Sequence, residues 1–361
     1  MSWEANRKIL LTLTVILVLS SILVPLNAGS FRWGKADETI HVGIYKAWNS
    51  TDHVSAAVPL LLKYLDGAKW KYRGKTYEFK ASIVEFKDVI DGELDKYDTL
   101  VLPGNGYYML ESLLDIFYNN KWKENMRKFV ENGGGYIGTC GAAIIACQNP
   151  IVGWPFIKTL GIVNLYAYET VSNEAQYYLQ DGLGIPALIH IKHSLNPILK
   201  GFYGSLRSIN YFGGPAFIPA HKHDKKYGRI IVLATYATEP SEIAPIHRPP
   251  VLGGGPVKTN LKGKYAIIAT TYGKGRIVLF GPHPELWSWR IDKVLSDNES
   301  RIEEGINARG KWYRWKEGIP IPNYNMWMIK RSIAWTVGKL SLSEKTYQVT
   351  TVEKVIQPQS T

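Results

Sequence analysis

The sequence of 361 residues has only two cysteines, Cys140 and Cys147. If the segment that joins them is helical, two turns separate their Cα atoms by about 10 Å, too far for a disulfide bond. The fold is therefore not expected to depend on disulfide bonds. A thiol kept without a partner needs another explanation, such as a chemical role.

Acidic residues are also scarce relative to basic ones, and the formal net charge is +12. A basic chain favours anionic partners such as lipid headgroups, acidic glycans or nucleic acid. Residues 69–73 and 311–316 mix basic and aromatic side chains, as some nucleic-acid sites do. No nucleic-acid-binding motif accompanies them. We therefore expect a basic surface with aromatic rings packed beneath it, and no nucleic acid as partner.

Metal-binding and cofactor motifs are lacking as well. Residues 221–224 read His-Lys-His-Asp, but companion ligands are not evident, so we interpret this stretch as a solvated turn. Residues 253–255 are three glycines without the strand and helix that a phosphate-binding loop requires. We expect neither a metal nor a cofactor.

The N-terminal segment is the one long apolar run of the chain. Positions 9–26 are almost wholly apolar, and two basic residues precede them. Such a run is a signal peptide cleaved near Ala28, or an uncleaved anchor of about 18 residues. Leu26 stands where signal peptidases prefer a small residue, which favours the anchor. We expect residues 1–35 to direct the rest out of the cytoplasm, membrane-anchored or, after cleavage, secreted.

From residue 39 onward the pattern alternates between strands and helices. Alternation of this kind implies a mostly parallel sheet with helices on both faces, a flavodoxin-like arrangement. We assign residues 36–340 to one such α/β domain and residues 341–361 to a loose tail. Strands are expected at 39–45, 79–86, 98–102, 135–138, 187–192, 208–211, 229–236 and 265–271, and helices at 53–65, 122–132, 141–147 and 325–337.

Two further features concern the second half. Residues 265–271 and 277–280 are joined by a turn with two glycines, which predicts a hairpin. Residues 239–264 and 286–322 are expected to be long loops, and the second carries Trp287 and Trp289. Long loops in compact domains are often functional. We predict that these tryptophans contact substrate near the mouth of the site; the alternative is that they only cover the core.

Residues 133–142, Gly-Gly-Gly-Tyr-Ile-Gly-Thr-Cys-Gly-Ala, are the most informative stretch. A short apolar strand leads to a cysteine flanked by small residues and then to a helix, as in a nucleophile elbow. Small neighbours permit the tight turn, and the helix terminus favours the thiolate of Cys140. The amide of Gly141 would face an oxyanion. Alternatively, Cys140 is a packed core cysteine.

Gly281-Pro282-His283-Pro284-Glu285 is the second piece of the predicted site. In extended backbone, residues two apart point the same way, so His283 and Glu285 can face one site. The prolines restrict the backbone and hold that geometry. Glu285 would then orient the imidazole, and His283 would exchange a proton with the thiol. The alternative is a turn with two exposed polar residues.

The elbow, the hairpin and the His-Pro-Glu sequence together resemble the class I glutamine amidotransferase-like superfamily. The stretch 135–140 with Asn-Tyr-Phe-Gly-Gly-Pro at 210–215 most resembles the biotin–protein ligase N-terminal-like family. The resemblance implies that Cys140 is the nucleophile, His283 the base and Glu285 its orienter. By the same resemblance, the oxyanion loop would be Gly104, Asn105 and Gly106.

The sequence departs from true glutaminase domains at two positions. Ala142 replaces the second glycine of their motif, and Ile144 replaces their glutamine. Ala142 should still permit the turn, but Ile144 weakens the case for glutamine as substrate. The chain has neither an ammonia-consuming domain nor a biotin-ligase catalytic domain, so biotin transfer does not follow from the family name.

The function predicted from the sequence is a thiol-dependent hydrolase or amidotransferase-like enzyme that acts on an amide or acyl group of a small molecule or peptide. Two alternatives remain. One is a catalytically silent module on the same fold that binds an extracytoplasmic ligand. The other is a cysteine peptidase. Rapid alkylation of the thiol at acid pH distinguishes an enzyme from a silent module.

Overall fold

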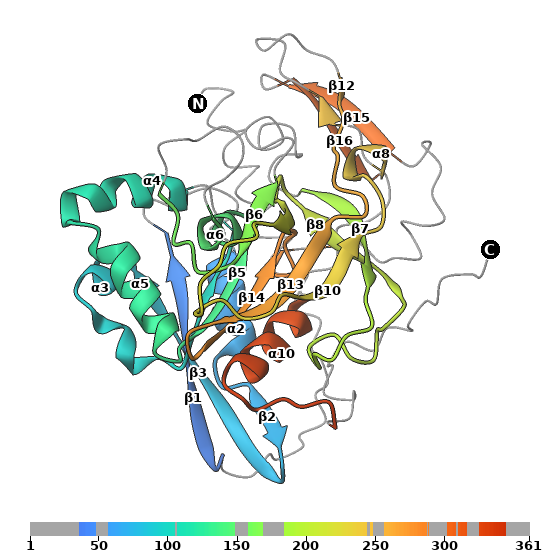
Figure 1. Ribbon diagram of the computed structural model, residues 1–361. Coiled ribbons are helices and arrows are strands. Elements are labelled where there is room, and N and C mark those ends of the chain that lie inside the picture. Colours follow the sequence, from blue (N-terminus) through green and yellow to red (C-terminus); the bar gives the residue numbers. More distant parts are fainter. Residues whose placement is uncertain are drawn as a thin grey trace, which may run out of the picture. The chain divides into compact units, whose positions relative to one another are not determined.

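A computed structural model gives the fold of the compact unit Asp37–Thr361 (Figure 1). The predicted N-terminal segment 1–35 and most of the tail 341–361 lie outside the residues that the structure describes. The described residues are 36–47, 57–104, 107–148, 158–168, 184–243, 246–247, 256–286, 288, 302–307, 310–315 and 325–343.

The first half of the unit alternates strands and helices, as the sequence predicts. The helices are α2 (Ala57–Leu65), α3 (Phe86–Ile90), α4 (Tyr107–Leu114), α5 (Lys121–Glu131) and α6 (Cys140–Ala146), with short 3-10 helices η2 (Glu93–Lys96) and η3 (Asp115–Tyr118). The strands are β1 (Glu38–Lys46), β2 (Lys69–Tyr72), β3 (Lys75–Glu85), β4 (Thr99–Leu102) and β5 (Gly135–Thr139).

The second half is mostly strands. They are β6 (Leu165–Tyr168), β7 (Ile185–Ile191), β8 (Leu206–Tyr211), β9 (Ala216–Pro219), β10 (Ile231–Tyr236), β11 (Ile246–His247), β12 (Pro256–Val257), β13 (Tyr265–Tyr272), β14 (Gly275–Phe280), β15 (Ile302–Asn307) and β16 (Gly310–Trp315). The described helices here are α8 (Pro240–Ile243) and the closing helix α10 (Met326–Thr336).

One large sheet organises the unit, and its two halves differ in strand direction. Its main path runs β2-β3-β1-β4-β5-β14-β13-β10-β7-β8. The neighbours from β3 to β14 are parallel, whereas β2 and the strands from β13 onward pair antiparallel. The parallel half confirms the α/β prediction. The antiparallel half was not predicted, because runs of strands without helices between them do not show their direction in the sequence.

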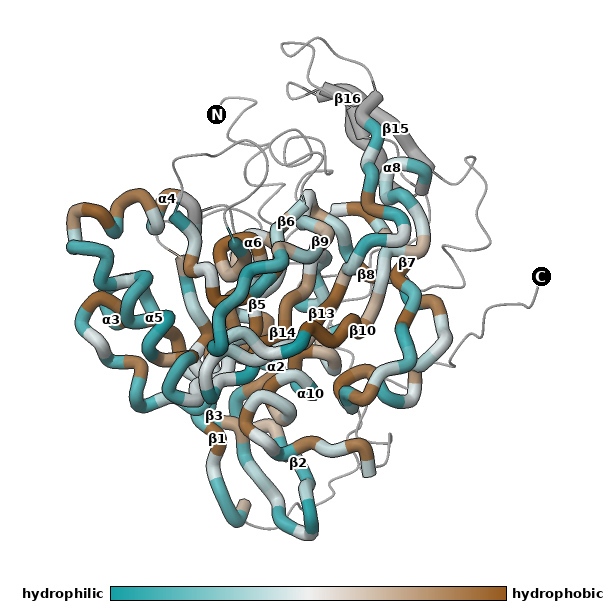
Figure 2. Tube along the Cα trace, viewed as in Figure 1, coloured by the Kyte–Doolittle hydropathy of each residue, from teal (hydrophilic) through white to brown (hydrophobic). Residues whose placement is uncertain are grey.

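Helices cover both faces of the parallel half, as predicted. Alternate residues of the central strands belong to separate cores: Val101 and Ile137 lie in one, Leu100 and Tyr136 in the other. The first core takes its helical residues from α2 and α10, and the second from α3, η2, α4, α5 and α6. Figure 2 shows apolar stretches also along β10 and β13, which belong to the antiparallel half. Strands buried on both faces account for the nearly continuous apolar runs in the sequence.

Two predicted loops contain structure that the sequence did not reveal. The loop predicted at 239–264 contains α8 and the short pair β11–β12, and the loop predicted at 286–322 contains the antiparallel hairpin β15–β16. The predicted hairpin is confirmed: β13 and β14 pair antiparallel around a turn in which Gly273 has φ of 57°. Gly273 suits this turn because a left-handed backbone carries no steric cost without a Cβ.

The basic and aromatic stretch 69–73 is mostly strand β2. Trp70 is buried there, and its indole Nε1 donates a hydrogen bond of 2.7 Å to the carbonyl of Lys339. The expectation of a ring packed beneath basic side chains is thus confirmed at this position.

Among the described residues, no helix is long and apolar enough to cross a membrane, and the apolar run 9–26 is not among them.

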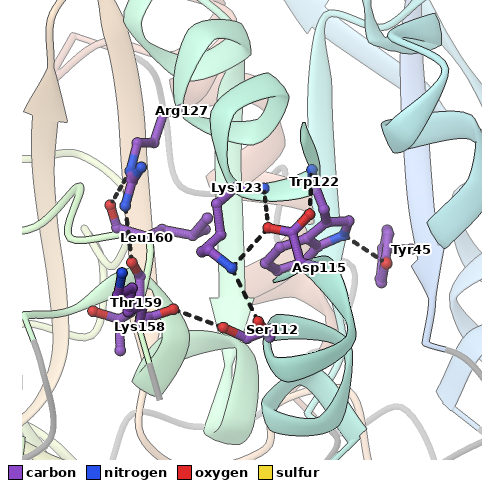
Figure 3. A network of polar contacts seen from close by, with 9 residues as sticks. All are labelled: Tyr45, Ser112, Asp115, Trp122, Lys123, Arg127, Lys158, Thr159 and Leu160. Carbon is purple, nitrogen blue, oxygen red and sulfur yellow. Dashed lines mark hydrogen bonds and ion pairs between the residues drawn. The ribbon is translucent and has the colours of Figure 1, made fainter. Parts of the chain in front are cut away.

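A buried polar network fixes α4, η3 and α5 to the segment that follows α6 (Figure 3). Asp115 and Lys123 are buried and form an ion pair with 2.7 Å between Oδ2 and Nζ. Asp115 also accepts two backbone N–H groups at the start of α5. Ser112 and Arg127 donate side-chain hydrogen bonds to carbonyls within 158–160. Each buried charge has partners, and removal of either member would leave the other uncompensated.

Candidate active site

Three neighbouring parallel strands end at the candidate site. Gly104 follows β4 closely, Cys140 follows β5 directly, and His283 and Glu285 follow β14. These strands are adjacent in the order β4-β5-β14. Because the carboxyl ends of parallel strands share one edge of the sheet, the four residues come together where open α/β sheets place their ligands.

Cys140 has the backbone of a nucleophile elbow. Its φ is 45°, which is uncommon for a residue other than glycine and indicates local strain. It is the first residue of α6 and comes directly after β5. A Cβ atom placed on Gly138 would lie 3.0 Å from the carbonyl oxygen of Ala142, so a glycine is needed for this close approach of strand and helix. The turn therefore uses the small residues that the sequence singled out.

Cys140 is a buried residue whose thiol lies close to the segment after β8. The residue is 7% exposed, and its Sγ lies 3.9 Å from the carbonyl oxygen of Phe212. Across Gly104 it faces His283: a Cβ placed on Gly104 would lie 2.6 Å from Cys140 Cβ and 2.9 Å from His283 Nδ1. The two side chains thus share one small space.

His283 is held on three sides. Its Nδ1 and Glu285 Oε1 are 2.9 Å apart, and its backbone N–H donates a 2.8 Å hydrogen bond to the carbonyl of Asn210. The ring of Phe212 packs edge to face on the imidazole at 6.2 Å. Nε2 is buried and has no hydrogen bond of ordinary geometry within the described part of the chain. Nε2 is therefore the ring nitrogen available to Cys140.

The charges around His283 favour the imidazolium form. Burial disfavours this form, but the negative charges of Cys140 and Glu285 outweigh burial and raise the pKa of His283 to about 10. His283 is therefore expected to carry a positive charge at neutral pH when Cys140 and Glu285 are both charged.

Glu285 is fully buried, and three donors converge on its Oε1. These are His283 Nδ1 at 2.9 Å, the backbone N–H of Gly104 at 3.1 Å and the hydroxyl of Thr139 at 2.5 Å. Burial by itself would raise the pKa of Glu285, but the charge of His283 and the hydrogen bonds from His283, from Thr139 and from the backbone N–H of Glu285 lower it below its ordinary value. Glu285 is therefore ionised at neutral pH.

Some predicted site residues have another role or lie outside the described residues. The N–H of Gly104 donates to Glu285, so this amide is engaged by the carboxylate, and the role predicted for Gly104 in the oxyanion hole stays a prediction. Gly141 is buried in the first turn of α6. Asn105, Gly106, Trp287 and Trp289 lie outside the described residues, so their predicted roles in the oxyanion hole and in substrate contact stay predictions.

The sequence reasoning did not assign roles to the segment 210–215, which lines the site. Besides the contacts of Asn210 and Phe212, a Cβ on Gly214 would overlap the carbonyl of Gly281 and lie 3.6 Å from Cys140 Cα. The Gly-Gly-Pro sequence shortly after the strand β8 was the available signal. Thr139, which donates to Glu285, was also missed; its position next to Cys140 was the only clue.

Cys147 provides a contrast within the same segment. It is fully buried in the second core, and burial raises the pKa of its thiol well above the ordinary value. It caps α6 through backbone contacts and has no charged partner among the causes of that shift. Cys147 is thus a structural cysteine.

Parallel strands, helices on both faces and a strained cysteine between strand and helix define an α/β protein with a nucleophile elbow. Residues 95–310 match the family model described as biotin-protein ligase, N terminal. The match spans more than half of the chain, and the protein belongs to this family. No match was found among curated proteins.

Several solved structures are distantly similar. They include PurLQS from Thermotoga maritima (13% identity, 68% of this chain, 88% of that chain, TM-score 0.38). A second is a thua-like protein from Bacteroides uniformis (14% identity, 70% of this chain, 86% of that chain, TM-score 0.39). A third is a β-galactosidase from Bacillus circulans sp. alkalophilus (13% identity, 68% of this chain, 28% of that chain, TM-score 0.36). These values are too low to assign a substrate or an activity.

Proposed function

We propose that this domain is a thiol-dependent hydrolase or transferase that acts on an amide or related acyl group. One observation carries the proposal: Cys140 lies in a strained elbow and faces His283, whose other nitrogen is held by ionised Glu285. Membership of the biotin-protein ligase N-terminal family supports an amidotransferase-like function.

The chemistry proposed for these groups begins with the thiolate of Cys140. It attacks the carbonyl carbon of the substrate and forms a C–S bond, and the carbonyl oxygen becomes an oxyanion. His283 then transfers its Nε2 proton to the leaving nitrogen as the C–N bond breaks. In the second half, water gives a proton to Nε2 and attacks the thioester, which releases the acid and restores the pair. An acceptor amine in place of water would give transfer.

An oxyanion needs donors aimed at the position where its charge develops. The backbone N–H of Gly141, in the first turn of α6, is the donor we propose, since the amide of Gly104 is occupied by Glu285. Removal of one such donor typically lowers turnover about 100-fold or more in other enzymes.

The substrate we propose is a small molecule or peptide other than glutamine. Ala142 and Ile144, which replace the second glycine and the glutamine of glutaminase domains, both pack in the second core. Ile144 offers no side-chain hydrogen bond to a substrate amide. The peptidase alternative uses the same chemistry and differs only in the substrate.

The direct test is alkylation of the full-length chain by iodoacetamide at pH 6, followed by mass spectrometry of the two cysteine peptides. We expect Cys140 to react at least about tenfold faster than Cys147, because only Cys140 has an imidazolium beside it. Ammonia release from a panel of primary amides, with Cys140→Ser as the inactive control, tests turnover. Equal, slow alkylation of both thiols would refute the enzyme and favour the silent binding module.

The location we propose for the domain is outside the cytoplasm, as the apolar run at 9–26 suggests. Protease added outside intact cells should digest the domain. A cytoplasmic protein of the same cells, measured as a control, should survive. N-terminal sequencing separates the two forms, since a mature terminus near Gly29 indicates a cleaved signal peptide. Full protection of the domain would contradict both forms.

A further inference from the structure

Thr139 stands apart from the residues that perform the proposed chemistry. It is the last residue of β5, is fully buried, and its hydroxyl donates a 2.5 Å hydrogen bond to Glu285 Oε1. A hydroxyl that donates to a buried carboxylate stabilises the ionised form of that carboxylate. Thr139 thus acts on the acid behind the histidine, while its neighbour Cys140 faces the histidine itself.

The two oxygens of Glu285 are bonded very unequally. Oε1 accepts three hydrogen bonds, whereas Oε2 is buried and has no hydrogen-bond partner among the described residues. Only the donors on Oε1 therefore keep the carboxylate turned toward His283. Of these, the amide of Gly104 is part of the backbone, so among the described residues Thr139 is the one side chain besides His283 that fixes the orientation.

We propose that Thr139 is a positioning residue, whose hydroxyl keeps Glu285 ionised and its Oε1 turned toward His283 Nδ1. The inference rests on the proposed function of Cys140 and His283, and adds a fourth side chain to their arrangement. Thr139 touches neither substrate nor thiol in this role. It acts through Glu285 on the imidazolium, and through the imidazolium on the thiolate.

Thr139→Val removes the hydroxyl at nearly constant shape, and Thr139→Ser keeps it. We expect the valine variant of the full-length chain to alkylate at Cys140 about five- to tenfold more slowly at pH 6 than the parent, because Glu285 then protonates at higher pH. At pH 9.5, where a thiol ionises without help, the two rates should agree within about twofold. The serine variant should follow the parent at both pH values.

The matched control is Thr99→Val. Thr99 is another buried threonine of the same sheet, and its hydroxyl is 3.1 Å from that of Thr336. Its replacement removes a buried hydrogen bond of similar kind and should leave the pH profile of Cys140 unchanged. If Thr139→Val does not fold, Thr139→Ala is measured against Thr139→Ser in the same way.

A double-mutant cycle with Glu285→Gln shows whether Thr139 acts through Glu285. In the Glu285→Gln background, Thr139→Val should slow alkylation at pH 6 by less than about twofold. If the effects of Thr139→Val and Glu285→Gln on the alkylation rate are fully additive, or if Thr139→Val has the pH profile of the parent, the role of Thr139 is overturned. The proposed function is unaffected by either result. A parent chain whose Cys140 reacts no faster than Cys147 would overturn the proposed function, and this inference with it.

Discussion

Replacement of His283 by glutamine should slow the alkylation of Cys140 at pH 6 about 100-fold. With its pKa raised to about 10, His283 is an imidazolium across the neutral range, and in the mechanism proposed above this charge stabilises the thiolate of Cys140. The slowing caused by His283→Gln should be largest at acid pH, where the thiol depends on the imidazolium to ionise. It should fall to about threefold or less by pH 9.5, where thiols ionise unaided. The measurement is the alkylation rate by peptide mass spectrometry from pH 5.5 to 9.5.

Two internal references make this result specific. Cys147 is buried and has no histidine among the causes of its pKa shift, so it should be alkylated slowly and at the same rate in the parent and in the His283→Gln variant. His41→Gln replaces an exposed histidine of β1 and should leave the profile of Cys140 unchanged. If the His283→Gln chain reacts at pH 6 as fast as the parent, His283 does not activate the thiol.

Replacement of Gly104 by alanine should lower the free energy of unfolding by about 3 kcal/mol or more. The added Cβ would lie 2.6 Å from Cys140 Cβ and 2.9 Å from His283 Nδ1, and neither group can easily move away. The Cβ of Cys140 is fixed by its strained backbone, and the imidazole is held by Glu285. The site must open for the methyl group to fit, so alkylation at pH 6 should fall toward the rate of His283→Gln.

Gly74→Ala is the matched control for this change. Gly74 has φ of 79° in the turn between β2 and β3, and a Cβ there would meet no atom within 4 Å. Gly74→Ala should lower the free energy of unfolding by about 1 kcal/mol because of backbone strain, and it should leave the reactivity of Cys140 unchanged. Denaturant unfolding measures both variants. Equal midpoints together with parental alkylation in Gly104→Ala would contradict the crowding described here.

Much of the fold could be predicted because its elements have strong local signals. The apolar run at 39–45 became β1, the helical spacing at 122–132 became α5, and the glycine turn after 265–271 became the β13–β14 hairpin. Elements with weak signals were missed. Helix α4 and the strands β6 and β9 were not anticipated, because short segments depend on tertiary packing more than on their own periodicity.

The candidate site divides in the same way. The elbow around Cys140 and the pair His283 and Glu285 were visible because each is encoded by neighbouring residues. The donors to Glu285 were not, since Thr139 lies 146 residues and Gly104 lies 181 residues away along the chain. The hydrogen bond from the amide of Gly104 to Glu285 could not be foreseen for the same reason, and the role of Gly104 in an oxyanion hole stays a prediction.

The sequence alone therefore determined the class of fold, the family resemblance and the residues that bear reactive groups. These depend on periodicity, on small residues at a turn and on side-chain chemistry, all of which are local. Only the tertiary structure decided which groups meet: that Phe212 packs on the imidazole, and that Thr139 and Gly104 share one oxygen of Glu285. Strand order and register create these contacts, and both follow from the packing of the whole sheet.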